Sequence, residues 1–325
     1  MAAPLRIGLI GAGKHGLRYA RHIAVDLPET TLAALCRRDR AEGERAAAAF
    51  GCAWADDFRR LIDDSTIDAV VAAVPPGLHV AIVEAAMRAG KPLLIEKPLA
   101  PSLAEARQIR DLVRAGGLPC MVAHTLRFNG VVQTLGAHLA EIAPLQTMGL
   151  TQRFEPSMLP WLDRRAEAGG GIALHTGVHS FDLLRYLSGL EVEQVWGMID
   201  RRFTRETEDG FALLFRMRGA PIHGTVAGSR TTLGRNGLIE LAGEKGQLVG
   251  DHVHGFAYLL RGRERTELAV EGNVPTVRET LRAFVGALRD GTPVPITVED
   301  GLHAVAVADA CYRSASLGRP VSVAR

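Results

Sequence analysis

The stretch Leu5-Arg6-Ile7-Gly8-Leu9-Ile10-Gly11-Ala12-Gly13-Lys14-His15-Gly16 joins an apolar, strand-like run to a glycine-rich turn, and a helix-like segment follows it. In this context the pattern GxGxxG indicates a dinucleotide-binding turn. Its first glycine permits the tight turn, its second lets a pyrophosphate approach the backbone, and its third allows close packing of the helix. The predicted cofactor contacts in this turn are Gly11, Gly13, Lys14, His15 and Gly16, of which Lys14 and His15 are equally plausible as ordinary surface residues.

A second strand-like run, Thr31 to Cys36, is followed by Arg37, Arg38 and Asp39. In an NAD site, an acidic residue that binds the ribose is expected about 20 residues beyond the glycines. Arginine there suits a ribose 2′-phosphate better, because a guanidinium group matches a phosphate with paired donors. We therefore expect NADP(H) to be the preferred cofactor, with Arg37 and Arg38 as contacts, while Asp39 keeps NAD(H) possible.

Strand-like and helix-like segments continue to alternate as far as residue 124. The strands are expected at 67–74, in the apolar run that begins at Leu93 and at 120–124, and the helices at 42–50, 80–89 and 103–114. This alternation predicts an α/β fold with a doubly wound parallel sheet over residues 1–124.

Two loops at the carboxyl ends of these strands are the next candidates for the site. Pro75 and Pro76 close one strand and can hold a bare backbone loop against the nicotinamide ribose, with His79 as a structural residue or a minor cofactor contact. The run Leu93 to Ile95 ends in Glu96-Lys97-Pro98. Because open α/β sheets place ligands at these strand ends, Glu96 and Lys97 are predicted at the cofactor, where a reactive amine would be useful. The alternative is that both residues are only the polar cap of a strand.

Composition narrows the functional class. A chain of 325 residues is expected to form two domains. Its net charge of +2 gives no electrostatic reason to expect nucleic acid or a membrane as a partner. The four scattered cysteines favour neither a zinc knuckle nor a disulfide framework, and no signal-like or membrane-spanning segment is seen, so we expect a cytoplasmic protein.

Residues 125–325 read as a second, α+β domain. Strand-like segments with mixed polar and apolar alternation are expected at 146–154, 191–199, 209–217, 222–229, 236–242 and 246–250, and helices at 277–290 and 298–317. This pattern predicts a large, open, mostly antiparallel sheet with one covered face. An exposed sheet face is a liability for a monomer, so we expect a homodimer or homotetramer.

A helix predicted over residues 172–187 follows Gly169-Gly170-Gly171, which would let a substrate approach its start. His175, His179 and Asp182 share one face of this helix beside an apolar stripe. His175 and His179 have the spacing of metal ligands, with Asp182 as a third, but no glutamate follows His175 as in HExxH. We expect no metal here; this face of the helix is well suited to line a site, and the alternative for His179 is an ordinary buried histidine.

The order of these motifs resembles that of the Gfo/Idh/MocA family of nicotinamide oxidoreductases. The motifs are the glycine-rich turn, Val74-Pro75-Pro76 with His79, Glu96-Lys97-Pro98, His124-Thr125-Leu126-Arg127-Phe128, the triple glycine and Gly177-Val178-His179. The resemblance implies a Rossmann domain, a C-terminal sheet that often forms the oligomer interface, and a cis bond before Pro98. It also implies that Lys97 and His179 are catalytic, and it places His175 where the family usually has aspartate.

The resemblance further implies an oxidoreductase that transfers hydride between NAD(P) and a secondary alcohol or carbonyl of a sugar, inositol or related polyol. In this mechanism His179 accepts the hydroxyl proton and Lys97 stabilises the oxygen, although a desolvated Lys97 could itself carry the proton. Substrate contacts are expected from Arg127, Trp161, Asp163, His175 and His179. The alternative is a non-catalytic, nucleotide-binding sensor that keeps the fold.

Overall fold

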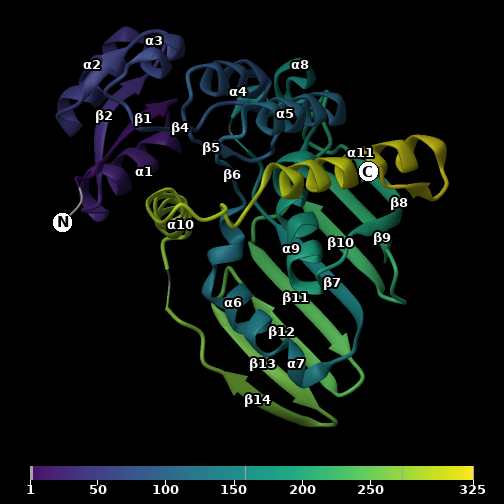
Figure 1. Cartoon of the computed structure of the whole chain (residues 1–325). Coiled ribbons are helices and arrows are strands. Elements are labelled where there is room, and N and C mark those ends of the chain that lie inside the picture. Colours follow the sequence, from purple (N-terminus) through teal and green to yellow (C-terminus); the bar gives the residue numbers. More distant parts are fainter. Residues whose placement is uncertain (1–2, 158, 273, 325) are drawn as a thin grey trace. The chain divides into compact units, whose positions relative to one another are not determined.

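The computed structural model describes residues 3–157, 159–272 and 274–324, and they form two compact units, each built around its own sheet (Figure 1). Unit 1 contains the chain up to Ala100, together with Ala104–Thr125 and Pro275–Leu302. Unit 2 contains Pro101–Leu103, Leu126–Val274 and the chain from His303 onward. The predicted fold class, a parallel α/β sheet plus a mostly antiparallel sheet, is confirmed.

Unit 1 has a six-stranded parallel sheet in the order β3-β2-β1-β4-β5-β6. Its strands are β1 (Leu5–Ile10), β2 (Thr30–Cys36), β3 (Ala53–Ala55), β4 (Ala69–Ala72), β5 (Leu93–Glu96) and β6 (Cys120–Ala123). Its helices are α1 (Gly16–Arg21) with the π turn η1 (His22–Asp26), α2 (Arg40–Phe50), α3 (Phe58–Asp63), η2 (Pro76–Leu78), α4 (His79–Arg88), α5 (Leu103–Gly116) and α10 (Thr276–Asp290). The strand order reverses between β1 and β4, which is where such sheets bind nucleotides.

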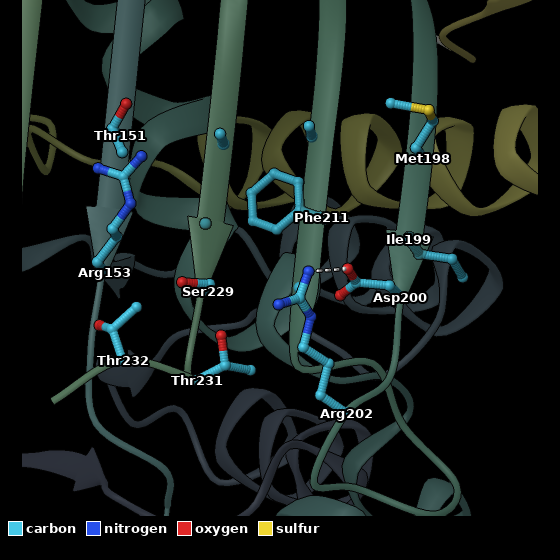
Figure 2. Close-up of a pocket in the computed structure, with 14 residues that line it drawn as sticks. Thr151, Arg153, Met198, Ile199, Asp200, Arg202, Phe211, Ser229, Thr231 and Thr232 are labelled. Carbon is cyan, nitrogen blue, oxygen red and sulfur yellow. Dashed lines mark hydrogen bonds and ion pairs between the residues drawn. The ribbon is translucent and has the colours of Figure 1, made fainter.

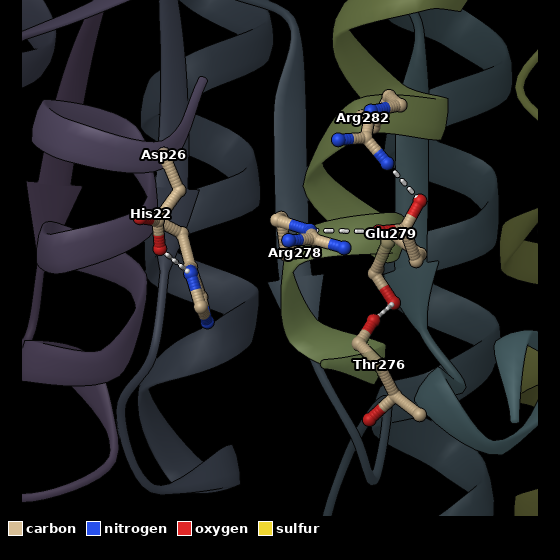
Figure 3. Close-up of polar contacts among 7 residues, drawn as sticks. His22, Asp26, Thr276, Arg278, Glu279 and Arg282 are labelled. Carbon is tan, nitrogen blue, oxygen red and sulfur yellow. Dashed lines mark hydrogen bonds and ion pairs between the residues drawn. The ribbon is translucent and has the colours of Figure 1, made fainter. Parts of the chain in front are cut away.

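Helix α10 belongs to unit 1, although the sequence-based division at residue 124 assigned it to the second domain. Its apolar stripe, which includes Val277, Leu281 and Phe284, is buried, and the helix packs against α1 and η1. Figure 3 shows η1, with its His22–Asp26 pair, beside α10, where Glu279 accepts from two arginines. An apolar stripe predicts that a helix packs, but it does not name the sheet on which it packs.

Unit 2 has a nine-stranded sheet in the order β14-β13-β12-β11-β7-β10-β9-β8-β15, in which only the β7–β10 pair is parallel among the described strands. Its strands are β7 (Leu145–Arg153), β8 (Val192–Asp200), β9 (Gly210–Met217), β10 (His223–Ser229), β11 (Asn236–Gly243), β12 (Gly246–Asp251), β13 (Phe256–Arg261), β14 (Glu264–Leu268) and β15 (Val321–Ser322). The strands β13, β14 and β15 were not predicted from the sequence.

Unit 2 also contains several helices, some of which pack on one face of its sheet. They are η3 (Thr125–Phe128), α6 (Gly130–Ala137), α7 (Leu139–Ile142), η4 (Pro160–Asp163), α8 (Arg165–Ala168), the π turn η5 (Ala173–Gly177) and α9 (Val178–Ser188), and α11 (Val298–Leu317) carries residues of both units. Met148, Leu150 and Gln152 of β7 are buried toward the covered face. None of the helices in the described ranges has the length and apolar character needed to cross a bilayer.

The other face of the unit 2 sheet is open. Figure 2 shows a hollow on it of about 510 Å³, bordered by Thr151, Met198, Ser229 and the Asp200–Arg202 ion pair. The hollow forms because small residues, Ala212 and Ala227, stand side by side across the middle strands.

Candidate functional site

The glycine-rich turn lies between β1 and α1 and has room for a ligand at one position. A Cβ atom on Gly16 would lie 1.7 Å from the Gly11 carbonyl oxygen, and one on Gly11, whose φ is +94°, would lie 2.3 Å from the Ala73 oxygen. A Cβ atom on Gly13 would meet nothing within 4 Å. The first and third glycines are therefore required by packing, and the second leaves bare backbone for a pyrophosphate. These residues fit a dinucleotide.

Glu96 ties this turn to the end of β5, a connection that the sequence analysis did not find. Its buried carboxylate accepts hydrogen bonds from Tyr19 Oη at 2.6 Å, His15 Nε2 at 2.7 Å and the Lys97 amide at 3.0 Å. Burial alone would raise the pKa of Glu96, but the hydrogen bond and charge of His15 and the charge of Lys97 outweigh it, so the pKa is lowered. Glu96 is thus a charged anchor that fixes the backbone of Lys97.

The two arginines after β2 differ in what they can offer a ribose phosphate. Arg37 Nη1 donates to the Ala12 carbonyl at 2.7 Å, and its Nη2 lies 3.5 Å from Glu42 Oε2. Arg37 therefore stabilises the glycine-rich turn. Asp39 caps α2 by accepting from the Glu42 amide at 2.9 Å. Arg38 is exposed, and no ion pair joins it to any residue of the described ranges. Of the predicted ribose contacts, Arg38 is the cation that remains available.

The loop after β4 is held from inside by His79. Its ring is fully buried, with Nδ1 3.0 Å from the Leu99 carbonyl and Nε2 3.2 Å from the Val74 carbonyl, and burial lowers its pKa. The ring thereby links the Pro75-Pro76 turn to the chain just after the Lys97–Pro98 bond, which is cis as expected. Because both ring nitrogens of His79 are bonded within the protein, we propose the backbone of this turn, and not the His79 ring, as a cofactor contact.

In unit 2, the segment predicted as one helix begins with a π turn. Residues Ala173–Gly177 form η5, and α9 starts at Val178. π turns inside helices are frequent at functional sites. His175 is buried and donates from Nε2 to the Ala168 carbonyl at 2.8 Å, while Trp161 stands edge-on to its ring at 5.3 Å. His179 lies in the first turn of α9 and is partly exposed.

The glycines before this turn have a role in packing. A Cβ atom on Gly169, Gly170 or Gly171 would lie 2.5, 2.3 or 1.9 Å from Pro101, Tyr312 or Glu208, respectively. Packing therefore explains why these positions are glycine, and because Gly171 also lines a hollow of unit 2, access for a substrate at the start of η5 stays a prediction. The three glycines let other parts of unit 2 pack against the start of η5.

Two predicted substrate contacts are engaged elsewhere in unit 2. Arg127 forms a buried, bidentate ion pair with Asp182, in which Nε donates to Oδ2 at 2.8 Å and Nη2 donates to Oδ1 at 2.5 Å. The guanidinium group of Arg127 also lies over the Tyr186 ring. Asp163 accepts from the amides of residues 205–207, which hold its pKa low against the raising effect of burial. Arg127 thus holds helix α9 through Asp182, and Asp163 holds the loop at residues 205–207, so neither is proposed as a substrate contact. Asp182 is likewise unsuited to bind a metal.

Comparison with known proteins gives the family. Residues 5–124 match the model of an oxidoreductase family with an NAD-binding Rossmann fold, GFO_IDH_MocA, and residues 144–249 match the GFO/IDH/MocA C-terminal domain. The chain is 26% identical to myo-inositol 2-dehydrogenase of Thermotoga maritima, with 98% of each chain covered. It is 25% identical to scyllo-inositol 2-dehydrogenase (NAD(+)) of Bacillus subtilis, with 99% of this chain and 97% of the relative covered.

Among solved structures, levoglucosan dehydrogenase in complex with NADH and levoglucosan superposes with a TM-score of 0.91 at 23% identity, over 99% of this chain and all of the other. That likeness supports the fold. The two family models together match more than half of the sequence, and the chain belongs to the GFO/IDH/MocA family of oxidoreductases.

Proposed function

We propose that this protein is an NAD(P)-dependent oxidoreductase that interconverts a secondary alcohol and a carbonyl on a sugar, an inositol or a related polyol. The observation that carries the proposal is the glycine-rich turn. Close packing leaves no room for a side chain at Gly11 and Gly16, whereas no atom lies near the Cβ position of Gly13, where a ligand can approach the backbone. It occurs in a chain whose relatives over nearly their full length are inositol dehydrogenases. Those relatives also make the substrate class the natural one to test.

Lys97 and His179 are the proposed catalytic residues. The bound cofactor supplies a nicotinamide ring that accepts or returns hydride. His179 takes the proton of the substrate hydroxyl during oxidation, and the Lys97 ammonium donates a hydrogen bond that stabilises the developing charge on the same oxygen. His175 is proposed to act on His179 by position: its Nε2 donates to the Ala168 carbonyl, so only Nδ1 is left for a further hydrogen bond, where a carboxylate would offer two acceptor oxygens.

Turnover assays with both cofactors over a panel of inositols, hexoses and alditols test this function. We expect NAD(P)-dependent oxidation of at least one member. A non-catalytic nucleotide sensor is the second candidate, favoured by the histidine at position 175. Tight cofactor binding with no turnover on any member would support the sensor and contradict the enzyme.

We further propose that NADP(H) is preferred to NAD(H), through Arg38. Arg38→Ala should weaken NADPH binding about 10- to 100-fold, because it removes a charge-assisted pair with the 2′-phosphate, and should change NADH binding less than about 3-fold. Fluorescence titration measures both constants. Arg40→Ala is the matched control, since Arg40 is exposed and already bonded to Glu44. Tighter NADH than NADPH binding by the wild-type protein would contradict the preference.

Self-association through the open sheet face is the proposed state in solution, as a homodimer or homotetramer. Trp196, Met198 and Leu214 are 52%, 68% and 52% exposed there, and Trp196 and Leu214 are cross-strand partners. Leu214→Glu should therefore shift the protein to monomer, because it would bury a charge in the interface. Light scattering after gel filtration measures the mass. Val25→Glu, at an exposed apolar residue of unit 1, is the control, and a monomeric wild type would exclude this arrangement.

The cytoplasm is the proposed location. All four cysteines are free, and Cys36, Cys120 and Cys311 are buried, as expected for a protein kept in a reducing compartment.

A further inference from the structure

Unit 2 contains a hollow of about 330 Å³ that the sequence analysis did not anticipate. It lies between the 156–163 segment, the 203–209 loop and the start of η5, and its polar side chains include Asp163, Glu208, Asp209 and Arg230. Pro160 and Leu162 give it apolar walls. Its volume is at the lower end of the range for small-molecule sites.

The three acidic residues of this hollow are satisfied by unit 2 itself. Glu208 accepts from the amides of Gly171 and Ala173 and from Tyr312 Oη at 2.8 Å. Asp209 accepts from the amides of residues 202–204, and Asp163 from those of residues 205–207. Their oxygens are therefore occupied by loop amides and shape the hollow.

Arg230 is the exception. It follows β10, and its guanidinium donates to the neutral Thr176 Oγ1 at 2.8 Å. It forms no ion pair with any carboxylate of the described residues. Burial lowers the pKa of Arg230, with the charge of Glu208 opposing that effect. The Arg230 side chain is partly buried, and its guanidinium has N–H groups beyond the one bonded to Thr176 that can pair with an anion in the hollow.

The position of Arg230 connects it to the proposed catalysis. Its partner Thr176 lies three residues before His179, in the same continuous helical segment. Residues three apart on a helix have neighbouring side chains. Thr176 and His179 thus lie within about one turn of the same helical segment, so a substrate group held by Arg230 would lie near the turn that carries His179.

We propose that Arg230 binds a carboxylate of the substrate, which makes hydroxy acids of the sugar series, such as uronates, better substrates than their neutral counterparts. This inference rests on the proposed oxidoreductase function. A monoanion fits better than a phosphate, because Arg230 is the one cation facing three carboxylates among the residues that line the hollow. A planar carboxylate can also accept two parallel hydrogen bonds from a guanidinium group.

The test compares matched substrates that differ by the carboxylate, D-glucose with D-glucuronate and D-galactose with D-galacturonate. We expect kcat/KM to be about 10- to 100-fold higher for the acid of each pair. Arg230→Gln should remove most of this ratio through a higher KM, and Arg230→Lys should keep part of it. Equal kcat/KM values in the wild type, or an unchanged ratio in Arg230→Gln, would overturn the inference while the oxidoreductase function stands.

Controls separate binding from folding. Thr176→Val removes the hydrogen bond but keeps the cation, and Arg216→Gln removes an exposed arginine paired with Glu193, so both should keep the acid preference. Loss of the preference in Thr176→Val with its retention in Arg230→Gln would contradict the assignment. If no sugar or acid is turned over, calorimetric titration with glucuronate decides. Binding that weakens at least 10-fold in Arg230→Gln supports the site, and no binding to the wild type rejects it.

Discussion

Lys97→Met should lower kcat by about 10²- to 10⁴-fold while the dissociation constant of NADPH changes by less than about 3-fold. Methionine keeps an unbranched side chain of similar length but loses the ammonium group that is proposed to stabilise the reacting oxygen. The backbone of residue 97 should stay in place, because the Glu96 carboxylate that accepts from its amide is fixed by Tyr19 and His15. Stopped-flow turnover and fluorescence titration measure the two quantities.

His179→Gln should give a loss of similar size, and the double variant should lose little more than the worse single variant. Groups that act on one proton transfer are strongly non-additive. Lys245→Met, at an exposed lysine in the turn between β11 and β12, is the matched control and should keep wild-type kcat. Near-normal kcat in both Lys97→Met and His179→Gln would remove these residues from the mechanism.

The order of elements was predictable wherever the hydrophobic pattern is strong. Leu5–Ile10 and Val298–Leu317 match their predicted bounds, and the strand predicted in the run from Leu93 is present as Leu93–Glu96. Strand β14 was missed because four of its five residues are exposed and charged or polar, so no alternation marks it. The π turn was missed because Ala173–Gly177 carries the same apolar spacing as the helix that follows it.

The site was predictable in residue type, but its side-chain pairings were not. The motif placed Glu96 and His15 near the cofactor, yet their bond joins residues 81 positions apart and depends on β1 and β5 lying on either side of β4. The same limit applies to the glycines at 169–171, whose packing partners are remote in the sequence. Arg230 gave no signal at all, because a lone arginine after a strand is ordinary until its burial and its neighbours are known.

The largest effect on stability is expected at the Arg127–Asp182 pair. Asp182→Leu or Arg127→Met alone should destabilise unit 2 by about 3–5 kcal/mol, because each removes one charge of a buried, two-bonded ion pair and keeps the other. The side chain of Asp182 is 1% exposed and that of Arg127 is 9% exposed, so water cannot compensate for the loss of the ion pair.

The double variant Arg127→Met/Asp182→Leu should be more stable than either single variant, because two apolar side chains replace the ions together. Urea unfolding followed by tryptophan fluorescence in a Trp54→Phe background reports on unit 2, because Trp161 and Trp196 lie there and Trp54 lies in unit 1. A double-mutant cycle in that background isolates the coupling energy. The exposed Arg216–Glu193 pair is the control, where the same cycle should give about 0–1 kcal/mol. If the coupling at Arg127–Asp182 were as small, the pair would not organise the helical layer of unit 2, and Arg127 would again be a candidate for the substrate.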